Sequence, residues 1–262
     1  MTLARQNALA CRMKPYIRLL KRRVIMQISE WRKVVGEMVR DHMRSPQMEH
    51  YFSVKMNQQR AQLMITQLGL YIRHRRDCWA LVSANCPVMA VKQAILRHEF
   101  GEVIKDQYSE YGHLHLIIRQ AEKLGLSADE VIETKPIAST TATLYAWAWL
   151  THAKSWIEGL SALTVTEWTN DDRLLNDAGG GHSTRMGKRW TEDMGLQWRD
   201  MPNFAAHAEA DEEHSDMFLP FLSEYATGEK EQLALTAVKE SLDLFALYRE
   251  GVAKAMEEIP LK

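Results

Sequence analysis

The stretch of sequence that decides the fold reads His207-Ala-Glu-Ala-Asp211-Glu-Glu-His214. On an α-helix, His207, Asp211 and His214 stand at i, i+4 and i+7, so their side chains project from the same face. Imidazole and carboxylate groups are ligands that iron and manganese accept. The spacing therefore predicts a helix that presents metal ligands to the interior of the protein.

A second stretch upstream repeats this spacing. In Asp106-Gln-Tyr-Ser-Glu110-Tyr-Gly-His113, three candidate ligands again stand at i, i+4 and i+7. The apolar positions around this stretch predict one continuous helix over residues 88–122, on which Glu102 extends the same stripe by one more turn. We therefore expect a second helix that turns acids and an imidazole toward a common site.

A third candidate element carries a single acid, Glu167, inside the apolar run from Gly159 to Trp168. A lone acid or histidine on a helix is more often a surface residue or a salt-bridge partner than a ligand. A buried carboxylate without a partner is costly, however, and a nearby cation would offset that cost. A dinuclear iron or manganese centre needs roughly six such ligands from several helices, so the combined pattern predicts a two-metal site. The candidate metal ligands are Asp106, Glu110, His113, Glu167, His207, Asp211 and His214, and Glu167, Asp106 and Glu110 are also the candidate catalytic carboxylates.

Composition and charge narrow the class of protein. The chain has 262 residues with 33 basic and 34 acidic side chains, a balance that does not favour nucleic acid or an acidic membrane surface as a partner. No stretch approaches the roughly 18 consecutive apolar residues of a membrane span. The three cysteines lack CxxC spacing and favour neither a disulfide framework nor a zinc ribbon. We expect a cytoplasmic protein that binds a small-molecule substrate, with no nucleic acid and no membrane span.

Residues 1–29 differ from the rest because seven basic residues precede the first acidic residue, Glu30. A basic amphipathic helix, a transit peptide and a true start at Met13 or Met26 all fit this composition. We favour a basic extension or an extra surface helix, because runs of like charge are usually solvated. Residues 30–262 are then expected to form one helical domain.

The residue pattern in the rest of the chain predicts an all-α fold of seven to eight helices. Gly and Pro fall between long helix-forming stretches, and no series of short alternating runs suggests a sheet. Gly125 suits a helix end, and Ser127 to Glu130 has the form of a capping box. We predict a solvated face at Arg73–Asp77, with an anion site as the alternative. The other expected elements are a long one over residues 140–168 with a break near 151–155, a loop over 170–182, and a last helix over about 229–257.

With these residues, the chain resembles the heme-oxygenase-like diiron oxidases of the TenA/PqqC superfamily, from about Asn57 to the C-terminus. The most specific part is an acid-x6-His pair on one core helix, a Glu on the next and HxxxDxxH on a third. Those positions hold Asp106 with His113, Glu167, and His207 with Asp211 and His214. His-x-Glu-Ala-Asp-x-x-His is similar to the chlamydial-type p-aminobenzoate synthase. The alkene-forming fatty-acid decarboxylase takes its acid three residues before the histidine, here Glu110.

The resemblance implies a heme-oxygenase-type bundle in which two Fe(II) ions activate O2 as co-substrate. The substrate would be a small-molecule metabolite, derived from an amino acid or a fatty acid, that is oxidised or cleaved. Manganese remains an alternative metal. The resemblance further implies a homodimer and an electron donor, which is a reductase, the substrate or the protein itself. The family usually has Glu seven residues before the histidine where this chain has Asp106, so the first ligand stays open between Asp106 and Glu110.

Three other functions remain open from the sequence. A metal-free oxidase or thiamin-fragment hydrolase on the same fold would bind a ring in its pocket instead of iron. A ferritin-like carboxylate protein is the second alternative, and it leaves His207 unexplained. Its ligands would be Glu110, His113, Asp211, His214, Glu167 and Asp77. A non-catalytic helical interaction protein is the third, and burial of Glu167 beside His207 would count against it.

Overall fold

The computed structural model describes residues 26–261, except for the side chains of residues 210–214. The predicted basic extension therefore falls largely on residues 1–25, which lie outside the described part. The described residues form α-helices and two short 3-10 helices without any strand, which confirms the all-α class. Seven to eight helices were expected, and the described residues form 13 α-helices, of which eight have 13 or more residues and five are shorter. The helices are α2 (Ile28–Met43), α3 (Pro46–Ser53), α4 (Gln58–Asn85), α5 (Met89–Val103), α6 (His113–Glu122), α7 (Ala128–Ile132), α8 (Ala138–His152), α9 (Trp156–Trp168), α10 (Asp172–Leu175), η1 (Asn176–Ala178), α11 (His182–Met194), η2 (Trp198–Asp200), α12 (Pro202–Met217), α13 (Leu219–Tyr225) and α14 (Glu229–Glu257).

The centre of the bundle is α9, whose sequence is apolar around most of its circumference. Every residue from Ile157 to Trp168 is buried, as expected for a helix that is covered on all sides. It packs against α14, α8, α4 and α12. Gly159 permits the close approach to α4, because an added Cβ would lie 2.8 Å from Val82 Cγ2. Glu167 is thus carried into the interior by a helix that the sequence makes a core element.

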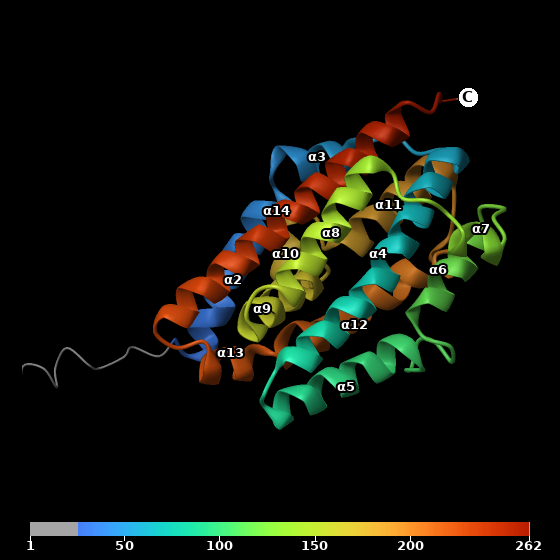
Figure 1. Cartoon of the computed structure of the whole chain (residues 1–262). Coiled ribbons are helices and arrows are strands. Elements are labelled where there is room, and N and C mark those ends of the chain that lie inside the picture. Colours follow the sequence, from blue (N-terminus) through green and yellow to red (C-terminus); the bar gives the residue numbers. More distant parts are fainter. Residues whose placement is uncertain (1–25, 262) are drawn as a thin grey trace, which may run out of the picture.

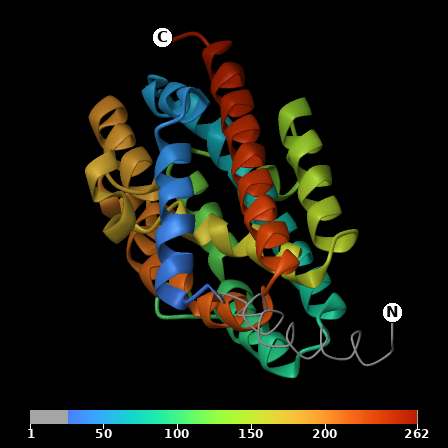
Figure 2. The ribbon, with the colours of Figure 1, turned by 90° about the vertical axis from the view of Figure 1, so that its left-hand side faces the viewer.

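Two long helices, α4 and α14, run along the bundle and pack against α9 and against each other (Figure 1). Figure 2 shows α14 in red between α2 in blue and α8 in yellow-green, and both of these helices contact it. Apolar side chains of these elements form one continuous core within the described part of the chain. None of the helices there has both the length and the apolar character that crossing a bilayer would require.

The predicted continuous helix over residues 88–122 is wrong. The structure divides this region into α5, which ends at Val103, and α6, which begins at His113. Asp106 and Glu110 therefore lie in the loop between two helices and not on a common helical stripe with His113. Figure 1 shows the two helices meeting at an angle at the edge of the bundle.

Local turn chemistry explains why the helix stops. Asp106 Oδ1 accepts hydrogen bonds from the backbone N–H groups of Tyr108 and Ser109, and an Asp that does so competes with helix formation. Gly112 has a φ of 71°, and a Cβ at this position would lie 2.5 Å from Val103 O. The chain therefore needs a glycine where it turns into α6. This loop sets the position of the first residue of α6.

Most other expected boundaries are confirmed. Gly125 has a positive φ after α6, and Ser127 and Glu130 form the capping box that opens α7. The long element breaks between α8 and α9, where the capping box of Ser155 begins the second helix. The last helix, α14, has the expected limits. Residues 170–182 are only partly a loop, because α10 and η1 lie within them.

We expect Gly112→Ala to lower the free energy of unfolding by about 3 kcal/mol, because its backbone at φ 71° and ψ 176° is strained for any residue with a Cβ and that Cβ would clash with the main chain of α5. Gly195→Ala is the control. Gly195 is in the left-handed helical region, at φ 72° and ψ 12°, with nothing within 4 Å of an added Cβ, so only a strain of about 1 kcal/mol applies. Urea unfolding followed by circular dichroism measures both values. Equal losses in the two variants would contradict the steric argument.

Candidate metal centre

Side chains from three helices converge beside the loop that follows α5. Glu102 stands near the end of α5, His113 is the first residue of α6, and His207 lies in the second turn of α12. Each offers one ligand atom, and these atoms all lie within 4.8 Å of one another. The two imidazole rings pack edge to face with their centroids 4.8 Å apart. We call these three residues the two-histidine cluster.

His113 is fully buried between two carboxylates. Its Nδ1 lies 3.1 Å from Glu102 Oε1, and its Nε2 lies 2.8 Å from Asp106 Oδ2. Burial alone would lower the pKa of His113, but the hydrogen bonds and negative charges of the two acids outweigh it and raise the pKa to about 9. The imidazole is therefore protonated at neutral pH. A cation that binds one of its nitrogens must displace a proton.

Glu102 is also buried, and Arg76 of α4 compensates its charge. Arg76 Nη1 lies 2.9 Å from Glu102 Oε2 and 3.0 Å from Glu99 Oε1. Burial would raise the pKa of Glu102, but the positive charge of Arg76 and the contact with His113 hold it well below its usual value. Glu102 is therefore a carboxylate at neutral pH.

His207 is partly buried and neutral. Its Nδ1 lies 2.9 Å from Asn203 O, and because a carbonyl oxygen only accepts, Nδ1 carries the proton. The lone pair of His207 is then on Nε2. Burial, followed by the positive charge of His113, lowers the pKa of His207 to about 4. The imidazole offers a ligand atom at neutral pH without first losing a proton.

Glu167 lies near the end of α9 with 7% of its surface exposed. Its Oε1 accepts a hydrogen bond of 2.6 Å from Arg75 Nη2, and His98 Nε2 lies 3.9 Å from the same oxygen. Arg75 also donates to the hydroxyl of Tyr71 at 3.0 Å. The sequence predicts a cation that offsets the burial of Glu167, and in the structure the nearest cation is this guanidinium.

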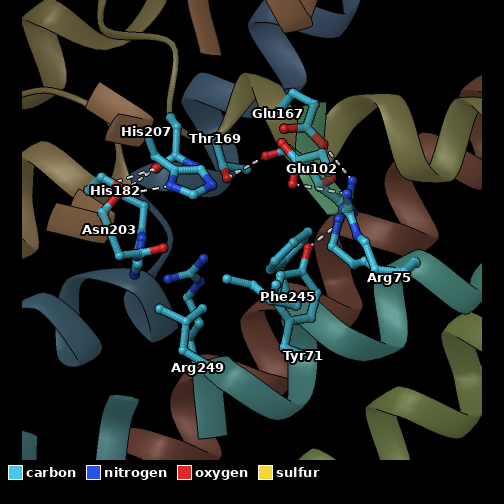
Figure 3. A pocket seen from close by; sticks show the side chains of 16 residues that line it. Tyr71, Arg75, Glu102, Glu167, Thr169, His182, Asn203, His207, Phe245 and Arg249 are labelled. Atoms are coloured by element: carbon cyan, nitrogen blue, oxygen red, sulfur yellow. Dashed lines mark hydrogen bonds and ion pairs between the residues drawn. The ribbon is translucent and has the colours of Figure 1, made fainter. Parts of the chain in front are cut away.

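One cavity of about 50 Å³ borders these groups, which is room for a few water molecules. Figure 3 shows His207, Glu102 and Glu167 along one side of it and Arg249, Phe245 and Tyr71 along the other. His182 and Asn203 close one end. The cavity gives a small molecule access to the carboxylates and to one histidine of the cluster.

Of the two acids predicted before His113, one contacts it and the other does not. Asp106 reaches Nε2 of His113, which is the ring nitrogen on the side away from Glu102. Glu110 is exposed in a turn. Neither acid lines the cavity, whereas Glu102 does. In the sequence, Glu102 extends the stripe of acids but was not predicted to be a ligand. The loop between α5 and α6 brings His113 back beside α5, and this places Glu102 next to the two histidines.

On α12, the predicted helix is present, and His207 faces Glu102 and His113. Asp211 and His214 follow it on the same helix, but their side chains lie outside the described residues. Their role as ligands stays a prediction.

The polar residues that sequence reasoning missed come mainly from α4. The predicted solvated face at Arg73–Asp77 is wrong for Arg75, which is 5% exposed, and for Arg76, which points to Glu102. Arg75 shares its helix face with buried Ile72 and Trp79, at i−3 and i+4. That periodicity was the available indication that its side chain faces inward.

The comparison with known families agrees with this site. Residues 63–246 match the sequence model of a family described as iron-containing redox enzyme. The chain belongs to this family. Its members are redox enzymes by that description, which agrees with the ligand types found here. No curated protein sequence matches the chain.

Solved structures show that the fold is heme oxygenase-like. A domain of unknown function with a heme oxygenase-like fold from Shewanella denitrificans has a TM-score of 0.69 at 18% identity, covering 89% of this chain and 94% of that one. A CADD-like protein of unknown function from Nostoc punctiforme has a TM-score of 0.69 at 14% identity, covering 87% and 97%. A TenA homologue from P. horikoshii has a TM-score of 0.59 at 13% identity, covering 86% and 100%.

Two of the alternatives lose support from the geometry. A ferritin-like site needs Asp77 and Glu110 inside the bundle, and both are exposed. A non-catalytic scaffold would leave its acids on the surface, but Glu167 is buried and lines the same cavity as His207.

We expect Arg75→Met to lower the free energy of unfolding by about 3 kcal/mol, because it removes the guanidinium that compensates the buried Glu167 carboxylate. Arg73→Met, on the same helix at a partly exposed position, is the control and should change stability by less than about 0.5 kcal/mol. Chemical denaturation at pH 7 compares the two variants. If both substitutions changed the free energy of unfolding only slightly, the ion pair between Arg75 and Glu167 would not stabilise the fold.

Proposed function

We propose that the protein is a non-heme iron oxidase or oxygenase that uses O2 at a dinuclear site to oxidise or cleave a small molecule. The observation that carries this proposal is the two-histidine cluster. Two imidazoles and one carboxylate are a ligand set that holds one Fe(II) ion in non-heme oxygenases, so the cluster supports one ion of the proposed pair. The family membership supports the same metal. Bound ferrous iron would supply the O2 activation that protein side chains alone do not provide.

The cluster residues fit an ion at the position that their ligand atoms surround. Glu102 is already ionised, and His207 already presents the lone pair of Nε2. His113 would bind through Nδ1, the nitrogen next to Glu102. The role of these three residues is to hold the ion in a fixed geometry beside the cavity.

Asp106 and Asn203 have a different role, which is to orient the two histidines. Asp106 accepts the Nε2–H of His113, and Asn203 O accepts the Nδ1–H of His207. Each contact selects one tautomer and fixes the ring, as outer partners of metal-bound histidines usually do. In this proposal Glu102 takes the place of Asp106 or Glu110 as the carboxylate ligand beside His113. Glu102 lies with both histidines of the cluster, whereas Asp106 contacts the other nitrogen of His113 and Glu110 is exposed.

A second ion would use Glu167 together with Asp211 and His214, which the resemblance implies. Glu167 lines the cavity, and the other two follow His207 on α12 at the spacing that turns them to the same face. Arg75 would hold the Glu167 carboxylate in a fixed orientation until the ion is bound. Manganese is the alternative metal for both positions. The electron donor and the homodimer stay predictions.

The first test is an anaerobic Fe(II) titration of the metal-free protein. We expect about two ferrous ions per chain. In Glu102→Gln and in His207→Ala, the affinity of the two-histidine cluster for Fe(II) should fall by at least about tenfold, because each variant removes a side chain that binds the ion directly.

Glu110→Gln is the control, since this acid is exposed and near the cluster in sequence. It should bind iron like the wild type. Iron binding that is lost in Glu110→Gln and kept in Glu102→Gln would contradict the assignment. No iron binding at all would favour a metal-free oxidase or hydrolase.

The pKa values predict a second observable, which is proton release on metal binding. At pH 7, His113 is below its pKa of about 9 and protonated, whereas His207 is above its pKa of about 4 and neutral. Binding of the cluster ion should therefore release about one proton at pH 7 and none well above pH 9, and affinity should rise with pH in between. Calorimetry in buffers of different ionisation enthalpy measures this number. A release that does not change with pH would show that His113 is not a ligand.

A further inference from the structure

The described part of the chain contains three strongly buried arginines, and they are not equivalent. Arg75 pairs with Glu167. Arg60, with 7% of its surface exposed, donates to backbone carbonyl oxygens, at 2.6 Å to Ile259 O and 2.8 Å to Lys55 O. Arg249 of α14 is 4% exposed, and no carboxylate in the described residues forms an ion pair with it. Within the described part of the chain, its buried positive charge has no carboxylate partner.

The surroundings of Arg249 are aromatic and neutral. Its guanidinium carbon lies 5.4 Å from the ring centroid of Tyr51 and 5.3 Å from that of Phe245. Burial raises the pKa of Tyr51, which keeps the phenol neutral although Arg249 opposes the rise. Burial, and then the charge of Arg249, hold the pKa of His182 well below its usual value. None of these neighbours supplies the negative charge that a buried guanidinium requires.

The acids that line the same cavity are committed elsewhere. Glu102 pairs with Arg76, and Glu167 pairs with Arg75. Figure 3 shows both on the side of the cavity opposite Arg249. The guanidinium therefore faces the cavity from a wall to which the described residues contribute no acid.

A second buried side chain in the same cavity has a polar atom without a hydrogen-bond partner. Asn203 is 2% exposed, and its Oδ1 is buried without a hydrogen bond. Figure 3 shows this amide directed into the cavity on the side of Arg249. A buried guanidinium without an acid partner among the described residues and a buried amide oxygen without a hydrogen-bond donor border the same cavity, which indicates a polar ligand.

We propose that Arg249 binds the carboxylate of the substrate, and hence that the substrate is a small carboxylic acid. The identification of this ligand as the substrate rests on the proposed function. A carboxylate anchored at Arg249 would direct the rest of its molecule across the cavity toward Glu102 and His207. The planar fork of a guanidinium matches a carboxylate with two parallel hydrogen bonds. The cavity of about 50 Å³ favours this planar group over a bulkier phosphate.

The test uses the full-length protein, both as purified and after chelation of metal, with propanoate as the probe. Thermal unfolding should shift upward with propanoate concentration in both preparations, because ligand binding stabilises the folded state. Propanamide has the same shape without the charge and should give no shift. Sodium chloride and inorganic phosphate at equal ionic strength distinguish a carboxylate site from a general anion site.

Two variants locate the response. Arg249→Met should weaken propanoate binding by at least about tenfold, and Arg249→Lys, which keeps the charge without the fork, should weaken it less. Without ligand, Arg249→Met should melt at least about 2 °C above the wild type, because it removes a buried charge that has no anion. A purely structural arginine would give the opposite sign. Arg185→Met is the matched control, since Arg185 also lies over an aromatic ring, Phe52, but pairs with Glu49 and lies outside the cavity.

The outcomes separate this proposal from the metal assignment. Arg249→Met should still bind Fe(II), whereas Glu102→Gln should lose affinity for the cluster ion and still respond to propanoate. Equal shifts with propanoate and propanamide, a response to phosphate alone, or propanoate binding that survives in Arg249→Met would each overturn the carboxylate site. If Arg249→Met fails to fold, the comparison of probes on the wild type and on Arg249→Lys still decides.

Discussion

Charge compensation in a dry helical interior is the constraint on which the site depends. Two consecutive arginines of α4, Arg75 and Arg76, reach acids on two other helices, Glu167 on α9 and Glu102 on α5. Neighbouring positions on a helix point about 100° apart, so one helix can serve both partners. Burial disfavours a charged carboxylate, and each guanidinium offsets that cost for its partner. The ion pairs therefore accommodate two acids at the wall of a cavity and at the same time tie α5 and α9 to α4.

The two histidines of the cluster show how closely placed groups acquire opposite protonation states. His113 lies between two carboxylates and has its pKa raised to about 9, whereas His207 faces a carbonyl oxygen and the charge of His113 and has its pKa lowered to about 4. Perturbations of this size in a cavity are typical of functional sites. The same arrangement defines which nitrogen of each ring is available, because the opposite nitrogen is occupied by Asp106 or by Asn203 O.

Arg249 shows that the structure does not optimise stability everywhere. A methionine or leucine on α14 would fill the same space among aromatic rings without the cost of a buried charge. Natural proteins retain such costs mainly where function needs them. Among the described residues, the cavity thus has an acidic side with its own arginines and a basic side without an acid, and this asymmetry would give a bound molecule a defined direction.

The sequence by itself determined the all-α class, the long helices α9, α12 and α14, the burial of Glu167 and the kinds of ligand that the site offers. Helical periodicity reports which residues share a face of one helix, and composition reports which helix is buried. Only the tertiary structure decided that Glu102, and not Asp106 or Glu110, borders the cavity, because an Asp turn and Gly112 interrupt the expected helix. The partners of the arginines and the position of Arg249 were also decided there. Such contacts join residues far apart in the chain, so they depend on how helices pack and not on any local pattern.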